Sequence, residues 1–177
     1  MGAINKLLSI GEKSRIRGID SWAQEIVNLS EENKALTDAE LVEKADSLRE
    51  KISSDPSLVD DKKTISDVFA VSMEASDRVL KQRPYKVQVM GGLVLASGMI
   101  AEMSTGEGKT LTAIAPTVLH AMTGRGAHVI TVNDYLAERD AEWMGRVYNF
   151  LGLSVGVVKS TSTQEERREA YEADVTY

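Results

Sequence analysis

Apolar residues recur at helical spacing throughout the first 80 residues, with no strand-like alternation among them. This periodicity predicts helices at residues 3–9, 19–32, about 37–52 and 64–83. Thr37 followed by Glu40 is a capping box, which marks the start of the third helix, and Pro56 in "SSDPS" breaks the chain after it. The short helix at 3–9 either packs on the body of the protein or lies in an anionic membrane surface or against a partner.

The pattern changes after Pro84, where short apolar segments begin to alternate with longer amphipathic ones. We expect helices at residues 86–96, 109–123 and 135–151, and a further helix that the capping box of Thr163 and Glu166 opens and that ends near residue 173. Strands are expected at 98–103, 127–133 and 153–158, and from residue 174 onwards. Alternating strands and helices predict an α/β fold with a parallel sheet and helices on both of its faces.

A glycine-rich turn joins the first expected strand to the helix at 109–123. It reads Ser-Thr-Gly-Glu-Gly-Lys-Thr, from Ser104 to Thr110. A phosphate needs converging backbone N–H groups and a cation, and Gly106 and Gly108 permit that close approach. Lys109 would reach the outer phosphates, and the Thr110 hydroxyl would bind Mg²⁺. Met103 stands where the strict P-loop pattern has its first glycine, and a ligand-free turn is the alternative interpretation.

Several neighbouring polar residues are candidates for the same site. The amide of Gln88 can donate to and accept from an adenine edge, but it would also suit the surface of a short helix. Tyr85 would stack on a base or simply pack. Asp134 follows an expected strand, where α/β sheets bind ligands, yet we favour it as the N-cap of the next helix. Arg139, one turn into that helix, would reach phosphate or remain in solvent.

Composition excludes several classes of protein. The 177 residues carry a net charge of −6, which argues against a dedicated nucleic-acid binder. There are no cysteines and only two histidines, so a thiolate or histidine metal cluster is not expected. No apolar run is long enough to span a bilayer, and the N-terminus does not have the pattern of a secretory signal.

Three segments together resemble the SecA family of preprotein translocase ATPases. They are "RPYKVQVMGGLVLASGMIAEMSTGEGKTLTA", "HVITVNDYLAERDAEWM" and "REAYEADVTY", and the likeness extends over nearly the whole chain. Gln82 and Pro84 depart from the family pattern. The resemblance implies a RecA-like P-loop sheet and an ATP- and Mg²⁺-dependent motor of helicase superfamily 2. It also implies the matching site residues: Tyr85, Gln88, Thr105, Gly106, Glu107, Gly108, Lys109, Thr110 and Arg139. Of these, Lys109 and Thr110 would be catalytic, and Thr110 would bind the metal.

The same resemblance implies partners and a place in the cell. These are the SecYEG channel, unfolded preproteins, the chaperone SecB, anionic phospholipids bound by the N-terminal helix, and a second copy in a homodimer, with no nucleic acid required. The protein would be cytoplasmic and peripheral on the cytoplasmic face of the cell membrane. Residues 1–80 would be a helical segment, and residues 81–177 the N-terminal part of the first nucleotide-binding lobe.

We expect the lobe to be incomplete. The family's acidic DExD motif and its second motor lobe would lie beyond Tyr177, so the chain alone would not hydrolyse ATP. Two other functions stay open at this point. One is a lobe of a superfamily 2 RNA or DNA helicase, and the other is a non-catalytic membrane or interaction module built on residues 1–80.

Overall fold

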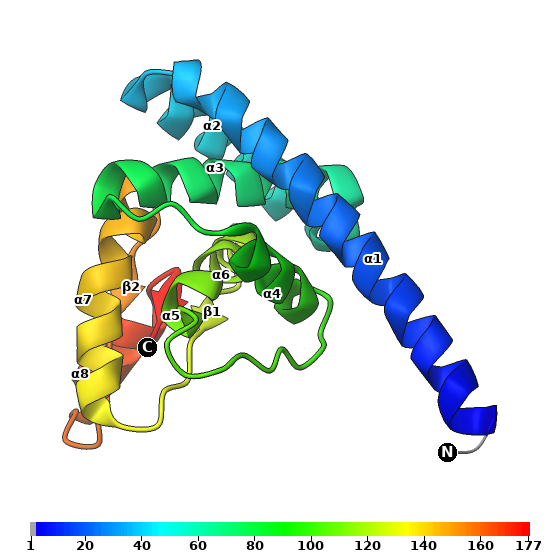
Figure 1. Cartoon of the computed structure of the whole chain (residues 1–177). Helices are drawn as coiled ribbons and strands as arrows, with labels where there is room; N and C mark the ends of the chain where they lie inside the picture. Colours follow the sequence, from blue (N-terminus) through cyan, green and yellow to red (C-terminus); the bar gives the residue numbers. More distant parts are fainter. Residues whose placement is uncertain (1–2) are drawn as a thin grey trace.

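The computed structural model describes the backbone of residues 3–177 and the side chains of residues 15–177. Helices dominate it, and a small parallel sheet lies near its C-terminus (Figure 1). The N-terminal half contains α1 (Ala3–Glu32), α2 (Asp38–Ser54) and α3 (Lys62–Leu80), joined by the 3-10 turns η1 (Asn33–Ala35) and η2 (Pro56–Asp60). The prediction of an all-helical first half is therefore confirmed.

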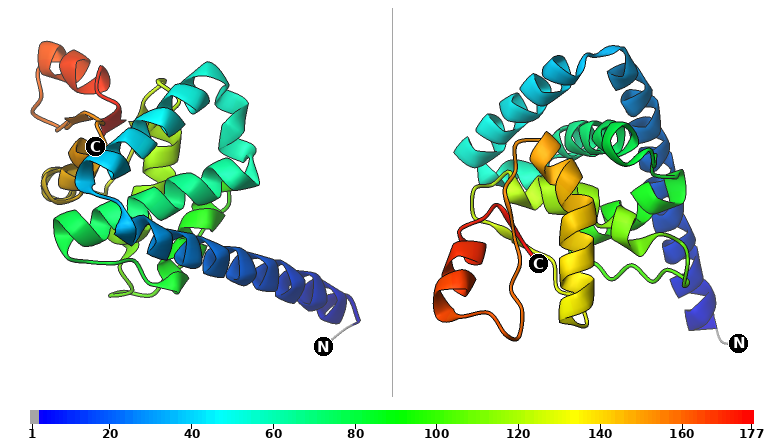
Figure 2. Two further views of the ribbon diagram at one scale, coloured as in Figure 1. Left: turned by 90° about the horizontal axis from the view of Figure 1, so that it is seen from above. Right: turned by 90° about the vertical axis from the view of Figure 1, so that its left-hand side faces the viewer.

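The two helices expected at residues 3–9 and 19–32 are one continuous helix. Between them, residues 10–18 contain two glycines but no proline. A glycine in a helix interior costs only about 1 kcal/mol, which does not break a helix whose remaining residues favour it. The C-terminal half of α1 packs on α3 and α4, whereas its N-terminal end projects away from the rest of the molecule (Figures 1 and 2).

Side-chain caps define where the helices of this half begin. At α2, Thr37 Oγ1 accepts from the backbone N–H of Glu40 and a Glu40 carboxylate oxygen accepts from that of Thr37, which confirms the predicted capping box. Asp61, which we did not identify from the sequence, caps α3 by accepting from Thr64 N at 2.8 Å. Helix α3 ends at Leu80, and its C-cap Lys81 has a left-handed φ of 57° that turns the chain.

The second half alternates helices and strands. It contains α4 (Lys86–Ala96), α5 (Lys109–Thr112), α6 (Ile114–Ala121), β1 (Ala127–His128), α7 (Asp134–Phe150), β2 (Val155–Gly156), α8 (Gln164–Tyr171) and β3 (Val175–Thr176). The strands pair in the order β1-β3-β2 and all run parallel, with Val175 opposite both Ala127 and Val155. An α/β arrangement with a parallel sheet is therefore confirmed, although the strands are shorter than predicted.

The strand predicted at residues 98–103 is not formed. These residues belong to the long loop between α4 and α5 (Figure 1), and Ile100 is 96% exposed. A strand requires a neighbouring strand for its N–H and C=O groups, and within the described part of the chain residues 98–103 pair with none of β1, β2 and β3. Ile130 and Val132, also predicted as strand, are likewise more than 80% exposed beyond the end of β1.

The helix predicted at 109–123 is interrupted at Ala113. Pro116 has no N–H to donate to the carbonyl of Thr112 four residues earlier, and its ring crowds that carbonyl. The interruption separates a single turn, α5, from the buried helix α6.

One hydrophobic core joins the two halves of the chain. It includes Phe69 of α3, Leu93 of α4, Val118 of α6 and Tyr148 of α7, each 1% exposed or less. The helical segment therefore supports the α/β part directly through packing.

Candidate phosphate-binding site

The glycine-rich turn is a tight loop at the start of α5. Gly106 and Gly108 adopt φ values of +87° and +82°, which are strained for any residue with a side chain. The Glu107 N–H donates to the Ser104 carbonyl at 3.3 Å, which closes a turn between them. Thr112 Oγ1 donates to the Gly108 carbonyl at 3.2 Å and so ties the loop to the turn of α5 that follows.

The loop already binds an anionic group from its own sequence. The backbone N–H of Ser104 donates to a Glu107 carboxylate oxygen at 2.7 Å. Lys109, which is exposed, turns back so that its Nζ donates to the Ser104 carbonyl at 3.0 Å. An N–H that donates to a carboxylate oxygen can also donate to a phosphate oxygen, and the ammonium of Lys109 lies at the same point of the loop. The loop therefore fits an anionic ligand.

Gln88 makes contact with this loop from α4. The backbone N–H of Tyr85 donates to its Oε1 at 2.9 Å, and its Nε2 donates to the Glu107 carbonyl at 2.9 Å. The side chain is 7% exposed, so the surface alternative for Gln88 is wrong. Its Nε2 also lies within 2.2 Å of the place that a Cβ on Gly108 would take. Glycine at position 108 is thus required both by its backbone angle and by the approach of Gln88.

Met103 replaces the first glycine of the strict pattern with a packing side chain. Its Sδ lies 3.5 Å from Thr112 Oγ1 and 3.2 Å from the position of a Cβ on Gly91 in α4. The methionine therefore fills the space between α4 and α5 at the base of the loop. This contact explains in physical terms how the loop accommodates a large residue there.

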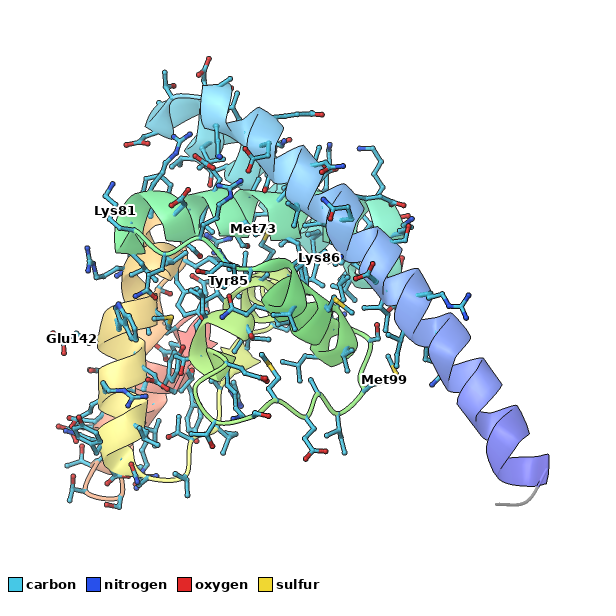
Figure 3. All side chains as sticks on the ribbon, in the orientation of Figure 1. Met73, Lys81, Tyr85, Lys86, Met99 and Glu142 are labelled. Carbon is cyan, nitrogen blue, oxygen red and sulfur yellow. The ribbon has the colours of Figure 1, made fainter. Side chains whose placement is uncertain are left out.

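The other candidate residues from the sequence, Tyr85, Thr110 and Arg139, differ in how exposed they are and in which helix carries them. Tyr85 is 76% exposed at the start of α4 (Figure 3), so packing does not explain it. Thr110 lies in the half-buried turn of α5. Arg139 is on α7, which packs against α5, but its guanidinium contacts its own neighbour Asp140 at 2.6 Å. Its side chain is 45% exposed on the solvent side.

Asp134 is not the N-cap of α7 that we favoured. Asn133 holds that position, and its Oδ1 accepts from Leu136 N at 2.9 Å. Asp134 instead accepts from the N–H and hydroxyl of Ser160, and these hydrogen bonds hold the pKa of the Asp134 carboxyl below its ordinary value. Its carboxylate connects α7 to the segment after β2 rather than to the phosphate loop.

A buried charge cluster beside α4 was missed from the sequence. Glu74, 4% exposed on α3, accepts from Arg78 and from Arg83, at 2.8 and 2.9 Å respectively. A signal was available in the i,i+4 spacing of Glu74 and Arg78 on α3. Burial of the pair, however, depends on how α1 and α3 pack, which periodicity alone does not give.

Within residues 15–177 no cluster of three or more acidic or histidine side chains could hold a metal ion. Among the described helices, none is long and apolar enough to cross a membrane. Thr110 remains the candidate for a Mg²⁺ ion that phosphate oxygens would help to hold.

Comparison with known proteins identifies the family. The model of the SecA DEAD-like domain matches residues 4–177. The chain belongs to the SecA DEAD-like domain family. It is 50% identical over 177 residues to the protein translocase subunit SecA 1 of Corynebacterium jeikeium, covering all of this chain and 20% of that protein. It is 51% and 49% identical to SecA 1 proteins of Mycobacterium sp. strain KMS and Mycobacterium tuberculosis, covering 98% of this chain and 18% of each.

Membership of the SecA DEAD-like family implies nucleotide binding and makes the small parallel sheet consistent with a RecA-like fold. The chain spans about a fifth of the length of these relatives. The helicase lobe and the interaction module are not favoured, because the matched family and these relatives are all SecA.

Proposed function

We propose that this chain is the ATP-binding part of a SecA-type motor, which couples ATP hydrolysis to moving unfolded preproteins through the SecYEG channel. The observation that supports this most is the family match over residues 4–177 together with an anion-accepting loop at its centre. Relatives of this chain are named protein translocase subunits.

The loop would bind the phosphates of ATP. In this proposal Glu107 and Lys109 release their contacts with Ser104, so that the Ser104 N–H and the Lys109 ammonium both become available to phosphate oxygens. Thr110 would hold Mg²⁺, and the ion would supply positive charge beside the phosphate oxygens. The phosphate-binding residues are Thr105, Gly106, Glu107, Gly108, Lys109 and Thr110.

The adenine would bind beside Gln88. An amide side chain offers two N–H donors and two carbonyl lone pairs, and the contacts to Tyr85 and Glu107 use one of each. The remaining donor and lone pair match the N7 acceptor and N6 donor of adenine, the same pairing that glutamine makes with adenine in DNA. The exposed ring of Tyr85 would stack on the base, and Arg139 would turn from Asp140 towards the phosphates.

We further propose that residues 1–80 act as a helical segment and residues 81–177 as the first part of the nucleotide-binding lobe. The projecting end of α1 would contact anionic phospholipids at the cytoplasmic face of the membrane, and SecYEG, preproteins, SecB and a second copy are the expected partners. The 177 residues alone are expected to bind ATP weakly and not to hydrolyse it, because phosphoryl transfer needs carboxylates and a second lobe that we place in the longer protein.

Two measurements test this function. The first is titration of the chain with a fluorescent ATP analogue and Mg²⁺, in which Lys109→Ala should abolish binding. Lys63→Ala, which removes a lysine that is 87% exposed on α3, is the matched control and should bind normally. Equal binding by wild type and Lys109→Ala would contradict the phosphate role.

The second measurement uses a chimera in which this chain replaces the matching part of the Mycobacterium tuberculosis relative. The chimera should hydrolyse ATP and move a preprotein into vesicles containing SecYEG, whereas the 177-residue chain alone should do neither. Turnover by the isolated chain at the rate of the full-length relative would refute the expectation that the lobe is incomplete.

A further inference from the structure

The linker between α3 and α4, residues 81–85, is fixed by one arginine. Nη1 of Arg83 donates to Glu74 Oε2 at 2.9 Å and to Asp77 Oδ2 at 3.1 Å, both on α3. Its Nη2 donates to Ser30 Oγ at 2.7 Å and lies 2.9 Å from a carboxylate oxygen of Glu31, both at the end of α1. A single guanidinium therefore joins two helices to the linker.

The burial of these partners makes the contacts specific. Ser30 is fully buried and Glu74 is 4% exposed, while the Arg83 side chain is 21% exposed. A carboxylate as buried as that of Glu74 needs its cationic partners, since removing one leaves charge in a poorly solvated place. The planar guanidinium reaches acceptors on both helices at once, which the single ammonium of a lysine does not.

The same linker leads within two residues to the nucleotide side of the molecule. After Arg83 comes Pro84, whose ring restricts φ, and then Tyr85, whose N–H donates to Gln88. Gln88 in turn donates to the Glu107 carbonyl in the phosphate loop. Figure 3 shows Tyr85 and Lys86 where this segment enters α4 beneath α3. Arg83 contacts α1 and α3, the chain leads from Arg83 to Tyr85, and hydrogen bonds of Gln88 join Tyr85 to the loop.

We propose that Arg83 is a positioning residue for nucleotide recognition: it holds the linker so that Gln88 reaches the phosphate loop and presents its free donor and acceptor to the base. The proposal rests on the proposed function of Gln88 as the adenine-reading residue. It gives the helical segment a direct effect on which nucleotide is bound, because α1 supplies half of the contacts that fix Arg83.

The test compares Arg83→Met and Arg83→Lys with Arg49→Met in the 177-residue chain. Arg49 is the matched control: it ties α2 to Asp174 and to the Gly152 carbonyl, both at 2.8 Å, and neither contact involves residues 81–85. Affinities for ATP and GTP are measured with Mg²⁺ at a temperature where circular dichroism shows every variant to be folded. Arg83→Met should lower the preference for ATP over GTP about tenfold, as expected from the net contribution of one hydrogen bond.

Arg83→Lys should restore part of that preference, and Arg49→Met should lower the melting temperature but leave the preference unchanged. An unchanged ATP to GTP ratio in Arg83→Met would overturn the proposal. Should Arg83→Met fail to fold, Arg83→Lys decides alone, with a loss of about threefold expected and no loss refuting the idea.

A second readout does not require nucleotide. Hydrogen exchange of residues 104–112 should become faster in Arg83→Met and stay at the wild-type rate in Arg49→Met. If the wild type binds no nucleotide but this exchange difference appears, the proposed function fails and the coupling through Arg83 stands. If nucleotide binds and the exchange rates of the two variants do not differ, the coupling fails and the proposed function stands.

Discussion

Replacing Gly108 with alanine tests whether the contact between α4 and the phosphate loop determines the shape of the loop. The φ of +82° costs alanine about 1–2 kcal/mol. The new Cβ would also lie 2.2 Å from Gln88 Nε2, so the amide has to leave its position. Moving it breaks the bonds to the Glu107 carbonyl and the Tyr85 N–H, each worth about 1 kcal/mol.

Gly106→Ala is the matched control, because Gly106 has nearly the same φ, +87°, and nothing within 4 Å of its added Cβ. Backbone strain alone should lower the free energy of unfolding of Gly106→Ala. Both variants also lose the same unfolded-state flexibility, so that contribution cancels between them. Gly108→Ala should therefore be less stable than Gly106→Ala by about 2 kcal/mol in urea unfolding followed by circular dichroism.

A double-mutant cycle with Gln88→Ala separates contact from strain. Once the amide is absent, Gly108→Ala has no side chain to displace and should cost no more than Gly106→Ala does. The double variant should then be more stable than the sum of the single changes predicts by about 2 kcal/mol. Additivity of the two changes within about 0.5 kcal/mol would refute the structural reasoning.

Three further outcomes follow from the structure. Gly156→Ala should lower the free energy of unfolding by about 3 kcal/mol, because the new Cβ would lie 2.4 Å from a backbone oxygen of α8. Gly145→Ala is the control: its Cβ would make ordinary contacts of 3.6 Å or more, so thermal melts should show it to be neutral or stabilising. Burial raises the pKa of Tyr148 from 10.0 to about 12, so the protonated phenol contributes fully to the free energy of unfolding below pH 10, and this contribution is lost as the pH rises towards 12. In Tyr148→Phe the free energy of unfolding should therefore fall less steeply over this pH range. Hydrogen bonds from Thr37 lower the pKa of Glu40 below 4.5, so its contribution is present above that pH and lost on acidification; melting temperatures of Glu40→Gln should change less between pH 5 and pH 3 than those of the wild type.

The helices and their starting points could be predicted from the sequence because the signals are local. Thr37 and Glu40 form their capping box through contacts three residues apart, and so do Thr163 and Glu166. The fold class followed in the same way from alternating segments after Pro84. The N-cap of α7 is Asn133, one residue before the Asp134 that we predicted. Asn and Asp both cap helices well, so their propensities do not show which of the two neighbours is the cap.

What the sequence did not predict depends on distant partners. Residues 98–103 have the composition of a buried strand, but a strand exists only where a neighbour completes its hydrogen bonds. The sequence carries no signal that shows whether Gln88, an amide on a short helix, lies on the surface or in the interior. Its burial follows from the position of Glu107, 19 residues away. The family resemblance predicted more of the site residues than periodicity did, and the roles of these residues are proposals.

The strand order β1-β3-β2 also sets when the sheet can form during synthesis. Of these three strands β3 is made last, yet it lies between β1 and β2, and within the described residues both of them pair with β3. β1 and β2 therefore cannot pair with β3 until residues 175–176 have left the ribosome, while the capped helices of the first half can already pack. Residues 175–176 thus complete the pairing of these three strands, and a chain shortened to end before Val175 should not assemble them.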